Sequence, residues 1–108
     1  MVSFGEIPRT NAELRAQPPE QHVLFVQLAQ QMESLGILVS DALVNVDLVD
    51  KTLGSFVTMA WTGYQPVFLE MRLSGDDPFL GEYFQWLAEL LDKRMRDNPR
   101  LPVYQRGQ

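Results

Sequence analysis

Residues 53–71 read LGSFVTMAWTGYQPVFLEM, and the spacing of the apolar side chains in this stretch decides the fold. Apolar residues recur here at steps of three and four, which is the period of an α-helix with one buried face. They are Leu53, Val57, Ala60, Tyr64, Val67 and Met71. The pattern predicts one long helix over about residues 48–73. Pro66 lies inside it and removes one backbone hydrogen bond, so we expect a kink near residues 62–65.

The segment before this helix has its own start and stop signals. Pro18-Pro19-Glu20 predicts a helix start, because proline is tolerated in a first turn and an acid is favourable near the positive end of the helix dipole. Apolar residues then recur at helical spacing at Leu24, Leu28, Met32 and Leu35, with Phe25 and Ala29 beside them. Gly36 predicts the stop, as a left-handed residue just past the helix.

Between Gly36 and the long helix we expect a buried connector over residues 37–39 and a short helix over residues 42–46. Ser40-Asp41 offers the side chains that cap a helix start, and Asp47 repeats that signal for the long helix.

After the long helix, the run Ser74-Gly75-Asp76-Asp77-Pro78 separates two helices. Gly75 predicts the end of one, Asp77 the cap of the next, and Pro78 its first position. The apolar line of the last helix consists of Leu80, Phe84, Leu87 and Leu91. We expect this helix to end before Pro99.

These elements predict an all-α chain of 108 residues with a single core. The expected architecture is a compact antiparallel bundle of three main helices plus one or two short ones, with the long helix kinked at Pro66. We expect an irregular lead-in over residues 1–17, with a short helical turn capped at Thr10. The helical domain would cover residues 18–98, and a frayed basic tail residues 99–108.

The distribution of charge argues against a nucleic-acid partner. The net charge is −5, with 4 basic and 13 acidic side chains over residues 1–92 and a basic end over residues 93–108. An acidic surface repels phosphate backbones. A helix-turn-helix interpretation of residues 27–46 fails for the same reason, because its recognition element over residues 40–50 holds three acids and no basic residue before Lys51.

The composition also predicts a cytoplasmic chain with no membrane span. No uninterrupted apolar run approaches the roughly 20 residues that cross a bilayer. Residues 1–9 do not have the basic and then apolar layout of a signal peptide. The absence of cysteine excludes disulfides, thiolate metal sites and thiol nucleophiles.

No set of residues predicts catalysis, a cofactor site or a metal site. His22 is the single histidine, and no serine nucleophile is tied to it by spacing. Glu82, Glu89 and Asp92 share a rough face of the last helix, but the Glu-x-x-His pairs of di-metal bundles are absent. These acids are better explained as a solvated stripe paired with nearby basic residues. We therefore expect a protein that is not an enzyme.

Large aromatic residues and one arginine form the most interesting group. The aromatics are Trp61, Tyr64, Tyr83, Phe84 and Trp86. Such a group is usually core, although tryptophan and tyrosine are also the anchors of protein–protein interfaces. Arg72 is either a helix-terminal ion pair with nearby acids or a half-buried fork that holds the Glu82 carboxylate, and we favour the fork.

The order of several residues along the chain resembles the pattern of a family of uncharacterised small bacterial all-helical domains. These residues are Gly54, Trp61, Pro66, Arg72, Pro78 and the run Glu82-Tyr83-Phe84-Gln85-Trp86-Leu87. Members of that family carry a glycine, a tryptophan separated by four residues from a helical proline, an arginine, a proline and a closing Phe-x-x-Leu helix. The resemblance covers about residues 20–92 and implies a helical fold without an assigned activity. Its members often follow a single membrane-spanning helix, which we do not expect in this chain.

Two functions remain open from the sequence. The first is a non-catalytic protein-interaction or scaffolding module, whose aromatic and apolar helix face binds a protein partner or a second copy in a homodimer. The second is a small-ligand sensor, with an apolar pocket between the kinked helix and the last helix.

Overall fold

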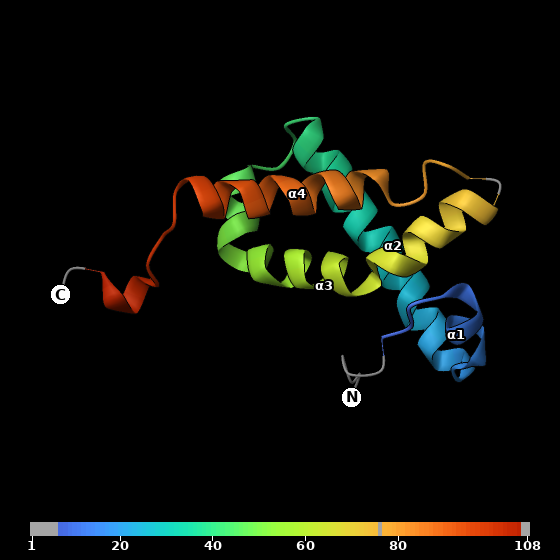
Figure 1. The fold of residues 1–108 in the computed structure, drawn as a ribbon. Coiled ribbons are helices and arrows are strands. Elements are labelled where there is room, and N and C mark those ends of the chain that lie inside the picture. The colour runs from blue at the N-terminus through green and yellow to red at the C-terminus, as the bar shows by residue number, and fades with distance from the viewer. Residues whose placement is uncertain (1–6, 76, 107–108) are drawn as a thin grey trace.

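Four α-helices and one short 3-10 turn form the regular structure of residues 7–75 and 77–106, which are the residues that this computed structural model describes. The elements are α1 (Asn11–Ala16), α2 (Pro19–Ser40), α3 (Val46–Ser74), α4 (Glu82–Asp97) and the 3-10 turn η2 (Val103–Gln105). These residues contain no strand, so the all-α prediction is confirmed. α4 packs against both α2 and α3, and α1 contacts α2 and α3, as expected for a helical bundle (Figure 1).

The molecule is elongated, with principal extents of 49 × 31 × 21 Å. Its radius of gyration is 15.3 Å, against about 13 Å for an average compact domain of this length. Figure 1 shows the C-terminal end of α2 extending past α4 and the segment after α4 leading away from the helices. Much helix surface is therefore left without a neighbour among the residues that the structure describes.

The two predicted helix starts near the N-terminus are confirmed. Thr10 caps α1, and its hydroxyl oxygen accepts a hydrogen bond of 3.0 Å from the Glu13 N–H. α1 ends at Ala16, before the proline pair. Pro19 is the first residue of α2, where its missing N–H leaves no intrahelical bond unmade.

The predicted stop at Gly36 is wrong, because α2 continues through Gly36 to Ser40. Gly36 is buried where α2 crosses the start of α4, and a Cβ there would lie 2.8 Å from the Tyr83 carbonyl carbon. The glycine therefore permits a close approach of two helices. In sequence, a glycine at a crossing cannot be told from a glycine at a helix end.

The predicted connector over residues 37–39 and short helix over residues 42–46 are also wrong. Residues 37–39 belong to α2, and Ala42 has a φ of 59° in a turn that follows it. The Leu43 N–H reaches back to the Leu38 carbonyl oxygen at 2.8 Å, which closes the end of α2. α3 begins at Val46, and Asn45 caps it instead of the expected Asp47.

The junction between α3 and α4 agrees with the prediction in part. Gly75 follows the last residue of α3 as expected, whereas Asp76 lies outside the described residues. The prediction that Asp77 and Pro78 begin the last helix is wrong, since α4 begins at Glu82 behind a left-handed Gly81. Asp77 caps a turn instead, and its carboxylate accepts from the Phe79 N–H at 2.9 Å.

The end of α4 and the following tail lie close to the predicted boundary. α4 ends at Asp97, before Pro99 as expected. Residues 99–106 are exposed and include η2, and residues 107–108 of the predicted tail lie outside the described residues.

The core lies where α3 faces α2 and α4. Phe68 is at its centre, with ring centroids 5.4 Å from Phe25 of α2 and 5.6 Å from Phe84 of α4. The buried line of α2 consists of Phe25, Met32, Gly36 and Val39. This line is rotated from the expected one, so Leu24 is exposed and Leu28 and Leu35 are only half-buried.

Candidate interaction surface

Most of the predicted aromatic group belongs to the core. Trp61 and Tyr64 are buried on α3, and the Trp61 ring meets the Phe84 ring at 5.2 Å in an edge-on arrangement. Tyr64 packs against Phe25 at 5.3 Å. Burial raises the pKa of the Tyr64 hydroxyl above its ordinary value, because the phenolate would lose its hydration. These rings are thus unavailable to a partner.

The two other aromatic candidates lie at the edge of α4. Tyr83 is half-buried, and its backbone forms the contact with Gly36. Trp86 is 41% exposed and is the one member of the predicted aromatic group with an exposed side chain.

Arg72 is half-buried, as predicted, but its partner is not Glu82. Its Nε donates to the Leu80 carbonyl oxygen at 2.6 Å, and its Nη1 donates to the Gln85 side-chain oxygen at 2.7 Å. The guanidinium carbon lies 5.7 Å from the centre of the Trp61 ring, within reach of a cation–π interaction. The Glu82 side chain is exposed.

The Arg72 contacts position the turn before α4 on the end of α3. Its Nη2 is buried without a hydrogen-bond partner among the described residues. The sequence pointed to the wrong partner because the carboxylate is a stronger acceptor, whereas the fold brings a carbonyl and an amide within reach.

Glu33 is an important residue that no sequence pattern predicts. Its carboxylate reaches from α2 to α4 and accepts from the Phe84 N–H at 2.8 Å. Gly81 has no side chain with which to cap α4, so Glu33 satisfies one of the free N–H groups at the first turn. The bond joins residues 51 positions apart, and no local sequence pattern encodes it.

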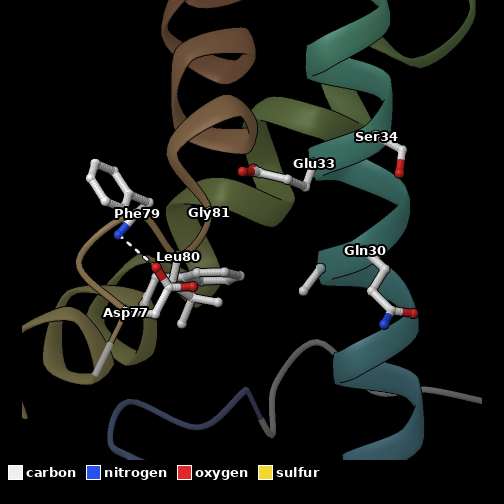
Figure 2. Close-up of a pocket in the computed structure, with 9 residues that line it drawn as sticks. Gln30, Glu33, Ser34, Asp77, Phe79, Leu80 and Gly81 are labelled. Carbon is white, nitrogen blue, oxygen red and sulfur yellow. Dashed lines mark hydrogen bonds between the residues drawn. The ribbon is translucent and has the colours of Figure 1, made fainter. Parts of the chain in front are cut away.

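A cavity of about 300 Å³ lies beside this contact, between α2 and the turn before α4. Figure 2 shows Glu33 pointing from α2 toward the first turn of α4, while Ser34 points away from it. Phe68, Phe79 and Leu80 supply apolar walls. The carboxylates of Glu33 and Asp77 already accept hydrogen bonds from Phe84 and Phe79, and Gln30 and Ser34 supply the other polar side chains of the cavity wall.

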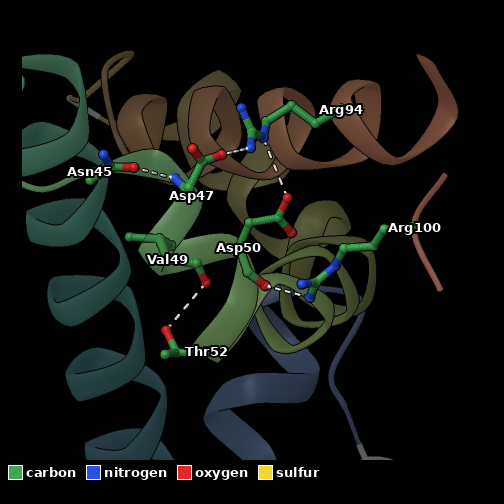
Figure 3. A network of polar contacts seen from close by, with 7 residues as sticks. All are labelled: Asn45, Asp47, Val49, Asp50, Thr52, Arg94 and Arg100. Atoms are coloured by element: carbon green, nitrogen blue, oxygen red, sulfur yellow. Dashed lines mark hydrogen bonds and ion pairs between the residues drawn. The ribbon is translucent and has the colours of Figure 1, made fainter. Parts of the chain in front are cut away.

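A polar network joins the start of α3 to the end of α4 (Figure 3). The Arg94 guanidinium pairs with Asp47 and, at 3.3 Å, with Asp50. The hydrogen bond that the Arg94 guanidinium donates to the Asp47 carboxylate is the main cause that raises the pKa of Arg94. Arg100 donates to the Asp50 carbonyl oxygen at 3.4 Å. The basic end of the chain therefore neutralises acids of its own α3.

The network borders a cavity of about 410 Å³, whose charged walls are largely paired with one another. No group of three or more histidine, cysteine, aspartate or glutamate side chains that could hold a metal ion occurs in residues 7–75 and 77–106. His22 is half-buried in the first turn of α2. No nucleophile–base pair emerges from these contacts.

One apolar flank of α2 lies beside the core and is only partly covered by it. Leu24 and Leu38 are 39% and 37% exposed, and Leu28 and Leu35 are half-buried beside them. With the exposed Gln31 they repeat at steps of four and three, which is the spacing of a seam between two helices. We call Leu24, Leu28, Gln31, Leu35 and Leu38 the α2 seam.

α2 is also long and apolar enough to cross a membrane, as judged by length and composition alone. Its most apolar 18-residue window has a mean hydropathy of 1.3, and 22% of that window is buried inside the molecule. Core helices of soluble proteins and signal sequences meet the same criterion. The expectation of no membrane span therefore stays a prediction.

Comparisons of the chain with protein-family models, with curated proteins and with solved structures find no match. The resemblance to uncharacterised bacterial helical domains therefore stays a prediction as well.

Proposed function

We propose that this chain is a non-catalytic protein-interaction module that binds its partner through the α2 seam. The observation that carries the proposal is a row of exposed and half-buried leucines on a helix whose adjacent face is packed in the core. Burial of apolar surface is the main driving force of association. The predicted aromatic face is replaced by this seam, because Trp61 and Tyr64 are buried.

Four further features that the sequence predicts are part of what we propose for this chain. They are an antiparallel arrangement of the bundle, a kink of α3 at Pro66, a bacterial source and a cytoplasmic location. α3 contains Pro66 inside a continuous helix, and the missing N–H supports a bend at that point.

Site-specific photo-crosslinking in cells tests the proposed function. A photoreactive residue at position 24 lies on the seam, and one at position 26 lies on the other flank of the same helix. Val26 is a matched control, since it is an apolar residue of α2 with 49% exposure. We expect protein adducts from position 24 and few from position 26. Equal adducts from the two positions, or none from either, would contradict the proposal.

Small-ligand sensing is the second candidate function, supported by the cavity of about 300 Å³ beside Glu33. That volume is at the lower end of roughly 300–1,000 Å³ for ligand sites. Between α3 and α4, where the sequence predicts an apolar pocket, a hollow of about 150 Å³ is lined mainly by polar residues, namely Thr58, Thr62, Glu89 and Asp92. A thermal-shift screen of metabolites that leaves the melting temperature unchanged would count against this function.

A further inference from the structure

We propose that the partner at the α2 seam is a second copy of this chain, related by a two-fold axis that passes near Gln31. This inference rests on the proposed function, since it names the partner of the same surface.

The geometry of the seam suits a second helix of equal length. At 3.6 residues per turn its five members fall within an arc of about 80° on one side of α2 and extend over about 21 Å. Phe25, Met32 and Val39 border this arc on the core side. The seam therefore continues the apolar surface of the core outward, and a second helix would extend the bundle.

The sequence of the seam is nearly symmetric about its centre. Leu24 precedes Gln31 by seven residues, and Leu38 follows it by seven. An antiparallel second copy would place its Leu38 against Leu24 and its Leu35 near Leu28, with the two Gln31 side chains at the axis. A two-fold contact of this kind is self-complementary.

Gln31 gives such a contact a defined register. An amide side chain carries both a donor and an acceptor, so two Gln31 side chains across the axis can satisfy each other. A single polar residue in an apolar seam commonly fixes register and oligomeric state, at some loss of stability. A sliding displacement of the helices would leave each amide against leucine.

The charge distribution favours a second copy over a strongly charged partner. The chain has a net charge of −5, so two copies repel each other wherever their acids face. The seam has no charged member, and residues 21–32 contain no aspartate, glutamate, lysine or arginine. Glu33 lies on the other flank of α2, where it is bonded to Phe84. This seam is thus a surface at which two acidic copies can meet with little local repulsion.

A lipid bilayer is the less favoured occupant. Insertion of α2 would bring Gln21, Gln27, Gln30 and Gln31 into or near hydrocarbon, and buried polar groups without partners are costly there. It would also separate Glu33 from Phe84. No lysine or arginine on α2 is available for anionic headgroups.

The mass of the protein in solution provides the first test. Sedimentation equilibrium is expected to give a concentration-dependent mass that approaches twice the 12.4 kDa of one chain. The double variant Leu24→Glu with Leu38→Glu should weaken self-association by about 100-fold or more, because each subunit loses two apolar contacts and gains two charges at the contact. Val26→Glu, on the other flank, should leave the dissociation constant unchanged.

The outcomes of this test separate the proposal from a folding defect. Both altered leucines are partly exposed, so the circular dichroism of the double variant should keep the helical content of the wild type. A wild-type chain that stays monomeric at its highest soluble concentration would overturn the proposal. A double variant that dimerises as tightly as the wild type would also overturn it.

Cysteine crosslinking tests the position of the axis. The 108 residues contain no cysteine, so Gln31→Cys introduces a single thiol near the proposed two-fold axis. Oxidation should link two copies rapidly, whereas Gln30→Cys, about 100° away around the helix, should link slowly. Linkage of the Gln30→Cys chain at an equal rate would overturn the assigned seam.

Failure of this inference can be distinguished from failure of the proposed function. Photo-adducts at position 24 with a different protein, in a chain that is monomeric in solution, would overturn the second copy and leave the interaction module in place. Flotation of a monomeric wild type with vesicles of phosphatidylcholine and phosphatidylglycerol, abolished by the leucine double variant, would overturn both in favour of a membrane surface.

Discussion

Replacement of Gly36 by alanine tests the interpretation of the α2–α4 crossing most directly. Gly36 is an interior residue of α2, where helix propensity alone favours alanine over glycine by about 1 kcal/mol. A helix that merely tolerated this glycine would therefore gain stability. The structure predicts the opposite sign, because the new Cβ would lie 2.8 Å from the Tyr83 carbonyl carbon and 3.0 Å from its Cβ.

The size of the effect follows from what the added methyl group displaces. The nearest atoms are backbone atoms of α4, which cannot rotate away, and overpacking of this kind costs about 1–3 kcal/mol. Separation of the two helices also stretches the bond from the Phe84 N–H to Glu33, and a hydrogen bond to a charged group is worth about 1.5–3 kcal/mol. After the gain in helix propensity is subtracted, we expect Gly36→Ala to lower the free energy of unfolding by about 2 kcal/mol.

Urea and thermal denaturation followed by circular dichroism measure this loss. A change of 1 kcal/mol shifts the melting temperature of a domain of this size by about 4–8 °C, so Gly36→Ala should lower it by roughly 10 °C. Gly63→Ala is the matched control inside α3, because its Cβ would meet only the flexible end of the Ile7 side chain. The control should be neutral or stabilising. A Gly36→Ala protein as stable as the wild type would refute the reasoning.

Three further predictions concern contacts that the structure places between helices. Glu33→Ala should lower the free energy of unfolding by about 1–3 kcal/mol in urea, and Glu33→Gln by less, because the amide oxygen can still accept from Phe84. Arg72→Lys should lower the free energy of unfolding by about 1–3 kcal/mol, because lysine cannot make both contacts of the guanidinium. Glu82→Gln should change it by less than about 0.5 kcal/mol. A larger loss for Glu82→Gln than for Arg72→Lys would instead support an Arg72–Glu82 ion pair. The raised pKa of Tyr64 implies a contribution to stability that is fully present below pH 10.0 and lost as the pH rises through the folded-state pKa. The melting temperature of Tyr64→Phe should therefore fall less steeply with rising alkaline pH than that of the wild type. An equal fall for the two proteins would count against a raised pKa of Tyr64.

Features with local causes could be predicted from the sequence. The cap at Thr10, the start at Pro19 and the end of α3 at Gly75 each depend on side chains or dihedral angles within a few residues. The period of α3 is also local, since most of its predicted line is buried. Such signals act before any tertiary contact forms, and for that reason they remain valid in the folded chain.

The candidate site could be predicted only in part. The sequence predicts a half-buried Arg72, but the choice of Leu80 and Gln85 over Glu82 depends on how the turn before α4 folds back on α3. The sequence does not predict the role of Glu33, because the N–H that it binds belongs to a helix that is distant in the sequence. The sequence predicts that the leucines of α2 are apolar, but not that the core covers them only in part.

The sequence by itself determined that this chain is helical, where α1 lies, where α2 begins, where α3 and α4 end, and which residues are apolar enough to be buried. Only the tertiary structure decided that Gly36 lies at a helix crossing rather than at a helix end. It also decided that Phe25, Met32, Gly36 and Val39 face the core, with the leucines of α2 beside them. The physical reason is that the apolar stripe of α2 is wider than one neighbour can cover. Helix periodicity determines the width of that stripe. Which part of it is buried depends on where α4 approaches most closely, and that is at Gly36, which has no side chain.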